Sequence, residues 1–188
     1  VKRLNGILIK PGEEFSANKY AGPYTLGNGF LPEMVIKGNE IKPEVGGGMC
    51  QIGTTLFRTA MNSGMPITER RNHSLVVSYY ADPVNGNPGT DSTLYEPTVD
   101  FKFLNNTTQS ILIQTKIDTE NLQLTLSLYG TSDGRKSEIL NHKVWGESPP
   151  PAPLYQDDPT LPKGALRQVD FPAWGANASF QYKVTRRG

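Results

Sequence analysis

The only cysteine in the chain, Cys50, directly follows three glycines and Met49 in the stretch GGGMCQIGTT. A thiol attacks a carbonyl as thiolate, so a nucleophilic cysteine needs surroundings that lower its pKa. A helix starting here would place Cys50 at the positive end of the helix macrodipole, beside N–H groups without intrahelical partners. The glycines would let a substrate carbonyl approach the main chain closely. The stretch therefore indicates either a nucleophile with a backbone oxyanion hole or a buried structural cysteine behind a tight turn.

A cysteine nucleophile needs a general base, and the chain contains two histidines. His73, in ERRNHSLVVSYY, stands where a polar stretch runs into a predicted strand, and we prefer it to His142, in ILNHKVWG. Asp91, Asp100 and Glu69 are all candidates for the carboxylate that orients the imidazole. Asp91 is our choice because it follows a loop rich in glycine and proline, where functional residues are often mounted.

Two arginines, Arg70 and Arg71, precede His73. A guanidinium can bind a substrate carboxylate through two parallel hydrogen bonds. A solvated basic turn is the commoner explanation of such a pair. Arg70 is the residue we expect to contact substrate.

The composition limits what the chain can be. It has 188 residues, of which 36% are hydrophobic and 20% charged, with a formal net charge of +1. This length suits one core with a small appendage. The near-neutral charge excludes a typical nucleic-acid-binding protein. One cysteine and two histidines provide no zinc-site spacing, so we expect no metal and no cofactor.

The chain shows no sign of a membrane-spanning segment or of a signal peptide. Its first residues, VKRLNGILIKPGEEFS, look like a strand entering a turn, so we expect further sequence upstream. Membrane attachment is expected only through an anchor outside this chain. We expect the protein to be a monomer.

The first 45 residues alternate short apolar runs with glycine and proline, which indicates short strands and tight turns. VIKGNEI predicts a hairpin that turns at Gly38 and Asn39. The best helical pattern covers residues 50 to 63, with Gly64 at its end and Pro66 beyond it. The one main helix therefore begins at the cysteine loop.

The residues after this helix are expected to form strands. The β-branched or alternating runs are SLVVSYY, STLYEP, TVDFKFLN, SILIQTKID and LQLTLSLYG, and the last two predict an antiparallel hairpin. The expected fold is α+β and mostly β, with an antiparallel sheet core, one main helix and a small C-terminal β segment.

The composition changes near residue 147, where ESPPPAPLYQDDP stacks prolines that favour an extended linker. Strand-like patterning around one turn resumes in TLPKGALRQVDFPAWGANASFQYKVTRRG. We therefore expect a main domain at residues 1–146, followed at residues 147–188 by a linker and a small, incomplete β module.

Four stretches carry a family resemblance: NGILIKPGEEFSANKYAGPYTLGNGF, GGGMCQIGTTLFRTAMNSGMPITERRNHSLVVSYY, GTDSTL and VDFKFLNNTTQSILIQTKID. In this order, from about residue 5 to about residue 130, they resemble the VanW-like domain of bacterial cell-envelope proteins. The tail resembles, more weakly, the small glycine-containing β module that often follows such domains.

The resemblance implies a function. Some VanW-like domains act as L,D-transpeptidases with a cysteine nucleophile and make 3-3 cross-links in peptidoglycan. By this resemblance Cys50 would attack a peptidoglycan stem peptide, His73 would be general base and acid, and Asp91 would orient His73. The residues implied in oxyanion stabilisation or substrate binding are Gly47, Gly48, Met49, Gln51, Thr54 and Arg70.

The resemblance also implies an extracytoplasmic location in the bacterial cell envelope or cell wall. Two other readings remain open. One is a non-catalytic module that binds the cell wall, and the other is a cysteine peptidase or amidase that uses the same site with water as the acceptor.

Overall fold

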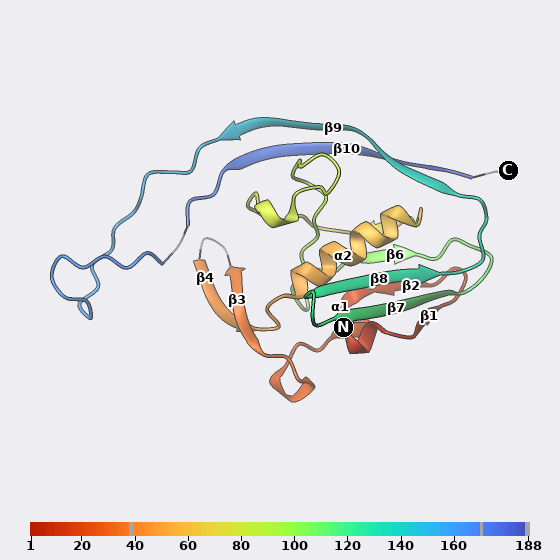
Figure 1. Cartoon of the computed structure of the whole chain (residues 1–188), viewed down its shortest axis with the longest axis horizontal. Coiled ribbons are helices and arrows are strands. Elements are labelled where there is room, and N and C mark those ends of the chain that lie inside the picture. The colour runs from red at the N-terminus through yellow and green to blue at the C-terminus, as the bar shows by residue number, and fades with distance from the viewer. Residues whose placement is uncertain (38–39, 170, 187–188) are drawn as a thin grey trace.

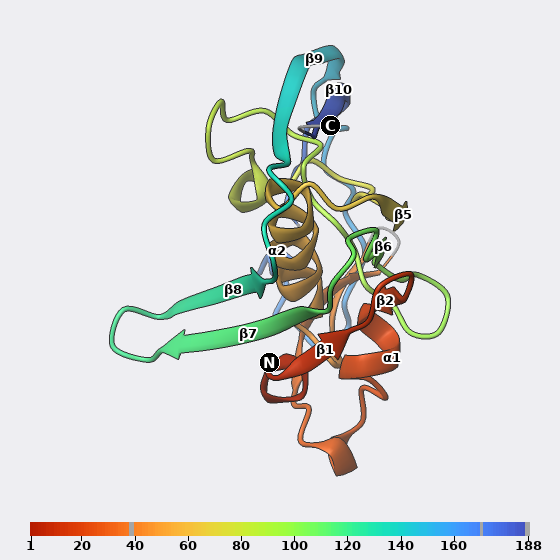
Figure 2. The same cartoon turned by 90° about the vertical axis from the view of Figure 1, so that its right-hand side faces the viewer.

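The computed structural model describes residues 1–37, 40–169 and 171–186. Helix α2 (Met49–Asn62) lies at the centre of the molecule. Two small antiparallel sheets flank it, and a long two-stranded ribbon arches over it (Figures 1 and 2). The predicted class, α+β and mostly β with one main helix, is confirmed.

Two three-stranded sheets, both antiparallel, frame the helix. The first has the order β1-β7-β8 and is built from Ile7–Ile9, Ile111–Asp118 and Gln123–Tyr129. The second has the order β2-β6-β5 and is built from Glu14–Ser16, Lys102–Leu104 and Ile67–Glu69. The predicted hairpin of SILIQTKID and LQLTLSLYG is confirmed, because β7 and β8 pair from Leu112↔Tyr129 to Asp118↔Gln123.

A separate hairpin leads into the cysteine loop. Strands β3 (Pro32–Lys37) and β4 (Glu40–Val45) pair antiparallel, ending at Lys37↔Glu40. The turn predicted at Gly38 and Asn39 lies outside the described residues. Three short helical segments and one short α-helix complete this region and its neighbours: η1 (Lys2–Leu4), η2 (Leu26–Asn28), η3 (Ser78–Tyr80) and α1 (Ala17–Ala21).

Helix α2 forms because its apolar residues recur on one face, and it begins one residue before the predicted start. Its buried side chains, among them Leu56 and Phe57, share one core with residues of both sheets, including Ile113 and Phe103. The Phe57 and Phe101 rings meet edge to face at 5.9 Å between centroids. This core fixes the position of the helix, and with it the position of Cys50. No helix among the described residues is long and apolar enough to cross a membrane.

The ribbon over α2 consists of β9 (Lys136–Ser148) and β10 (Gly175–Thr185), paired antiparallel. The Tyr182 hydroxyl donates to Met61 O at 2.9 Å, near the end of α2, and lies 3.2 Å from Met65 O. Ser137 Oγ donates to Asn62 O at 3.0 Å. The ribbon is thus held on the C-terminal end of α2. The division at residues 146/147 stays a prediction, and β9 runs across that boundary.

Three sequence predictions were wrong in detail. The run SLVVSYY is not a strand but irregular chain ending in η3, and STLYEP contributes only the isolated bridge Tyr95↔Val99. The tail forms one strand, β10, whose partner β9 was not predicted. The β-branched residues of SLVVSYY line a pocket and make no ladder, which explains why their strand propensity misled the prediction.

Candidate active site

Two positions of the glycine loop before the cysteine require glycine: Gly47 because of a close contact, and Gly48 because of its backbone conformation. A Cβ added to Gly47 would lie 2.2 Å from Glu33 Cβ on strand β3, so no side chain fits there. Gly48 is the N-cap of α2 and has a φ of 82°, in the left-handed region that favours glycine. The loop thus packs against β3 and turns sharply into the helix.

Cys50 occupies the first turn of α2, as predicted, and its side chain is partly exposed. The thiol donates to Leu94 O, with 3.6 Å between sulfur and oxygen. In the part of the chain that the structure describes, the Cys50 amide has no backbone acceptor, whereas the Met49 and Gln51 amides donate to Gly46 O and Gly48 O. The Cys50 N–H is therefore available to a developing oxyanion.

His73 is held in one orientation by two hydrogen bonds and a ring contact. Its Nδ1–H donates to Asp91 Oδ2 at 2.6 Å, and its backbone N–H donates to the same oxygen at 2.8 Å. The imidazole stacks on Tyr80, with ring centroids 4.6 Å apart and planes 19° apart. Because Nδ1 is bound to Asp91, Nε2 is the nitrogen left to exchange a proton with a reacting group.

Asp91 is held in turn by Arg70. The Arg70 Nε–H donates to Asp91 O at 2.7 Å, and Nη2 lies 3.4 Å from Asp91 Oδ1 and also donates to Gly89 O. The guanidinium lies over the Phe57 ring, 4.9 Å from its centroid. In this structure Arg70 supports the orienting carboxylate, and its expected contact with a substrate carboxylate stays a prediction.

The electrostatics couple these groups. Burial lowers the pKa of His73, but the hydrogen bond to Asp91 and the hydrogen bond and charge of Cys50 outweigh it and raise the pKa to about 9. Burial raises the pKa of Asp91, yet the hydrogen bonds from His73 hold it below its usual range. Burial, followed by the charge of Cys50, raises the pKa of Tyr80. Cys50 therefore contributes to the raised pKa of both stacked rings, His73 and Tyr80.

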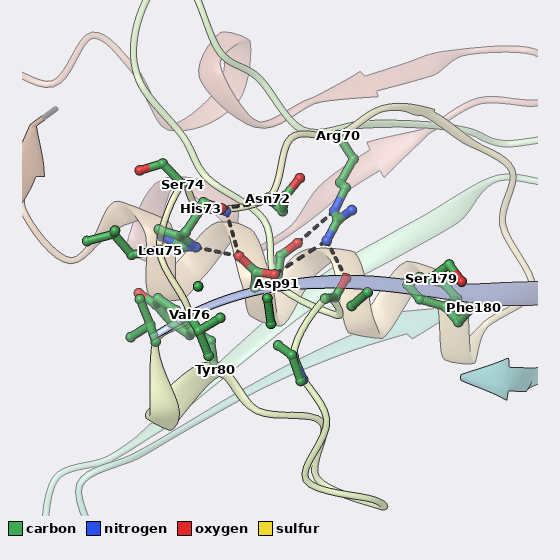
Figure 3. Close-up of a pocket in the computed structure, with 16 residues that line it drawn as sticks. Arg70, Asn72, His73, Ser74, Leu75, Val76, Tyr80, Asp91, Ser179 and Phe180 are labelled. Carbon is green, nitrogen blue, oxygen red and sulfur yellow. Dashed lines mark hydrogen bonds and ion pairs between the residues drawn. The ribbon is translucent and has the colours of Figure 1, made fainter. Parts of the chain in front are cut away.

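A pocket of about 440 Å³ opens beside this network (Figure 3). Arg70, residues 72–77 and Tyr80 supply one wall, and strand β10 supplies another through residues that include Ser179 and Phe180. Figure 3 shows Arg70 and His73 on opposite sides of Asp91, all three at the pocket. A substrate in this pocket would lie against the imidazole that Asp91 holds.

Arg70 lines the pocket, whereas Cys50 and the other predicted substrate-binding residues are not among its lining residues: Gly47, Gly48, Met49, Gln51 and Thr54. Thr54 is 1% exposed, and its hydroxyl donates to Ser92 O at 3.2 Å and accepts from Ser92 N–H at 3.0 Å. It joins α2 to the segment before Leu94. The Met49 side chain is buried, and Gln51 is exposed. Substrate contact by these three side chains stays a prediction.

The alternatives that the sequence left open have other partners. Glu69 pairs with Lys102 at 2.7 Å, and Asp100 accepts from Ser16 Oγ and from the Asn18 amide at the start of α1. His142 Nε2 lies 2.8 Å from Pro88 O, on the ribbon side of the pocket. Of the three candidate carboxylates, Asp91 is the one in contact with His73.

Two residues at the site escaped the sequence analysis. Tyr80, on which His73 stacks, was hidden in the mispredicted strand. Arg58 donates to Tyr80 O at 2.6 Å, to Ala81 O at 3.0 Å and to Thr90 O at 2.8 Å, which fixes both segments that flank the site. The four-residue spacing of Cys50, Thr54 and Arg58 on one helix face was the signal that could have found Arg58.

No group of three or more histidine, cysteine, aspartate or glutamate residues within the described ranges is placed to hold a metal ion. The groups that the site offers for chemistry are a thiol, an imidazole, a carboxylate and backbone amides.

Comparison with models of protein families shows which family the chain belongs to. The model of the family described as VanW like protein matches residues 1–127. The chain belongs to the VanW-like family. Cys50, His73 and Asp91 all lie inside the VanW-like match, whereas the β9–β10 ribbon lies outside it. No solved structure matches the chain.

Two curated proteins are similar to this VanW-like chain. YoaR of Bacillus subtilis (strain 168) is 34% identical over 115 residues, which is 61% of this chain and 36% of the relative. The vancomycin B-type resistance protein VanW of Enterococcus faecalis (strain ATCC 700802 / V583) is 30% identical over 122 residues, which is 64% of this chain and 44% of the relative. The match thus spans less than half the length of either relative.

Proposed function

We propose that this VanW-like chain is a peptidoglycan-modifying cysteine acyltransferase, an L,D-transpeptidase that forms 3-3 cross-links through a thioester on Cys50. The observation that carries the proposal is the geometry of the site: a partly exposed Cys50 lies in the first turn of α2, and His73 Nδ1 is held by Asp91 at 2.6 Å. The electrostatic interaction of His73 with Cys50 adds to this support. The similarity to a protein named for vancomycin resistance supports a cell-wall setting, and we place the chain in the extracytoplasmic cell envelope.

In the first half-reaction the Cys50 thiol gives its proton to His73 Nε2, and the thiolate attacks the carbonyl carbon of the third residue of a donor stem peptide. The C–S bond forms as the carbonyl oxygen becomes an oxyanion. The amide bond to the terminal D-alanine then breaks, and the His73 imidazolium gives its proton to the leaving amine. D-alanine is released and a thioester remains on Cys50.

In the second half-reaction the neutral side-chain amine of another stem attacks the thioester carbon. The C–N bond forms and the C–S bond breaks, and His73 takes the proton that the amine nitrogen loses. The cross-linked dimer leaves, and the His73 imidazolium returns its proton to the Cys50 thiolate, which restores the starting state. His73 thus acts as base toward the thiol, as acid toward the D-alanine amine and as base toward the acceptor.

The Cys50 N–H, together with the glycine-loop amides before it, is the proposed oxyanion hole. The amide of Cys50 has no acceptor within the described residues and lies at the N-terminus of a helix of 14 residues, where the macrodipole favours negative charge. One such donor in an oxyanion hole is typically worth about 3 kcal/mol of transition-state stabilisation.

A non-catalytic wall-binding module would tolerate a buried thiol without an imidazole partner. The partial exposure of Cys50 and its interaction with His73 favour the enzyme instead. A peptidase or amidase would use the same residues, with water in place of the acceptor amine.

The test is product analysis after incubation of the purified protein with a disaccharide-tetrapeptide muropeptide. We expect D-alanine and a 3-3 linked dimer from the wild type, and neither from Cys50→Ala. Release of D-alanine with only hydrolysed monomer would support the peptidase instead. No D-alanine from the wild type, with a correctly folded protein, would overturn the proposal.

A further inference from the structure

The ribbon that lies outside the family match forms part of the candidate active site. Gly175, Ala176, Ala178, Ser179 and Phe180 of β10 all line the pocket that contains His73 and Asp91. The ribbon is tied to the loop before Asp91, because His142 Nε2 lies 2.8 Å from Pro88 O and His142 Nδ1 lies 3.1 Å from Asn85 Nδ2. The substrate surface therefore extends beyond the residues shared with the family.

A second pocket, of about 340 Å³, continues from the first along the ribbon. The two pockets share Val76, Pro88, Gly175 and Ala176, so they form one continuous surface. The second pocket adds Glu147 at the end of β9 and Trp174 immediately before β10. Both residues therefore lie on the surface that leads from the ribbon to the pocket of His73.

The second pocket combines apolar walls with one negatively charged side chain, Glu147. Asp91 is bound to His73 and Arg70, whereas Glu147 has no cationic partner among the described residues. The Trp174 ring is 58% exposed beside it, and an exposed indole face attracts a cation. The matching ligand is a primary ammonium at the end of a flexible aliphatic chain, which could pack against Val76 and Pro88.

We propose that the pocket of Glu147 and Trp174 is the acceptor subsite, which binds the side-chain ammonium of a second stem peptide before it attacks the thioester. This inference rests on the proposed transpeptidase function. The bound ammonium loses one proton to water, and the resulting neutral amine then attacks as described above. The first pocket is thereby left to the donor stem.

Binding tests the subsite without requiring turnover. The Cys50→Ala protein is titrated with a tripeptide stem whose side-chain amine is free, and with the same stem acetylated on that amine. We expect the free amine to bind about five-fold more tightly, which is the size of an exposed ion pair with a cation–π contact. Added in this background, Glu147→Gln and Trp174→Ala should each remove most of that preference.

The matched controls lie on the same ribbon. Glu138→Gln removes a charge from β9 that is paired with Lys183 at 2.9 Å, and Trp145→Ala removes an indole from β9 that lines neither pocket. Both should retain the preference for the free amine. Equal binding of the free and acetylated stems, or controls that behave like Glu147→Gln, would overturn the subsite.

Turnover separates failure of the subsite from failure of the proposed function. In the Cys50 enzyme, Glu147→Gln should lower the ratio of dimer to hydrolysed monomer about five-fold. An unchanged ratio would overturn the subsite alone. Absence of D-alanine release from the wild type would overturn the transpeptidase function, and the binding comparison would then still decide whether the pocket recognises an amine.

Discussion

Replacing Asp91 with asparagine should lower the pKa of His73. In the wild type the pKa of His73 is raised to about 9 from an ordinary value of 6.5, against the opposing effect of burial. Asparagine keeps the shape of Asp91 but loses the charge that stabilises the imidazolium. A neighbouring opposite charge typically shifts a pKa by about one to three units, so we expect the pKa to fall by at least about one unit.

The same shift has a consequence for stability whose sign follows from linkage. Below about pH 6.5 the folded and unfolded states both hold the proton, and the stabilisation from His73 is fully present. As the pH rises from about 6.5 through about 9, the unfolded state loses the proton first, and the stabilisation disappears. The shift corresponds to on the order of 3 kcal/mol of unfolding free energy. The His73 side chain is only 9% exposed, so solvent screening is small.

Two measurements check this prediction. The imidazole resonances of His73 are titrated by NMR in wild type and Asp91→Asn, with His142, the other histidine of the chain, as a reference in the same sample. Urea unfolding at about pH 6 and about pH 9 should show a smaller pH dependence in the variant. A wild-type His73 that titrates near its ordinary pKa, or an unchanged pKa in Asp91→Asn, would refute the reasoning.

Three further substitutions and one control variant probe the site and its supports. Cys50→Ala should also lower the pKa of His73 in the same NMR titration, because Cys50 is among the groups that raise it. An unchanged pKa would mean that the Cys50 and His73 side chains do not interact in solution. Gly47→Ala should destabilise the protein by about 1–3 kcal/mol in urea unfolding, since its Cβ would lie 2.2 Å from Glu33 Cβ. Gly48→Ala, which strains only the backbone, serves as its control and should cost about 1 kcal/mol; equal losses would refute the steric argument. Tyr182→Phe should cost about 1 kcal/mol by removing the hydroxyl that donates to the end of α2, and no loss in urea unfolding would mean that the ribbon is not held there.

The start of the main helix could be predicted because its signals are local. A glycine run before Cys50 and Gly64 at the other end bracket an apolar periodicity, and α2 has nearly these bounds. The contact between His73 and Asp91 could only be suggested. Eighteen positions separate the two residues, and the intervening chain is irregular, so no periodic element relates them. The choice of Asp91 over Asp100 depended on loop composition, and the structure brings Asp91 to the imidazole.

The ribbon could not be predicted from local patterns. Strand β9 begins before the proline-rich stretch, and its partner β10 comes after it, so neither strand has a hairpin turn to mark the pairing. Many side chains of the ribbon alternate between exposed and partly buried positions, which weakens the hydrophobic signal. The role of β10 as a wall of the pocket depends on that long-range pairing.

The most direct test of the account is the intact mass of the wild-type protein after brief incubation with a tetrapeptide-stem donor and no acceptor. We expect a covalent adduct whose mass equals the donor minus D-alanine, located by peptide mapping to Cys50 and absent from Cys50→Ala. An adduct on another residue, or no adduct while D-alanine is released, would contradict the thioester mechanism.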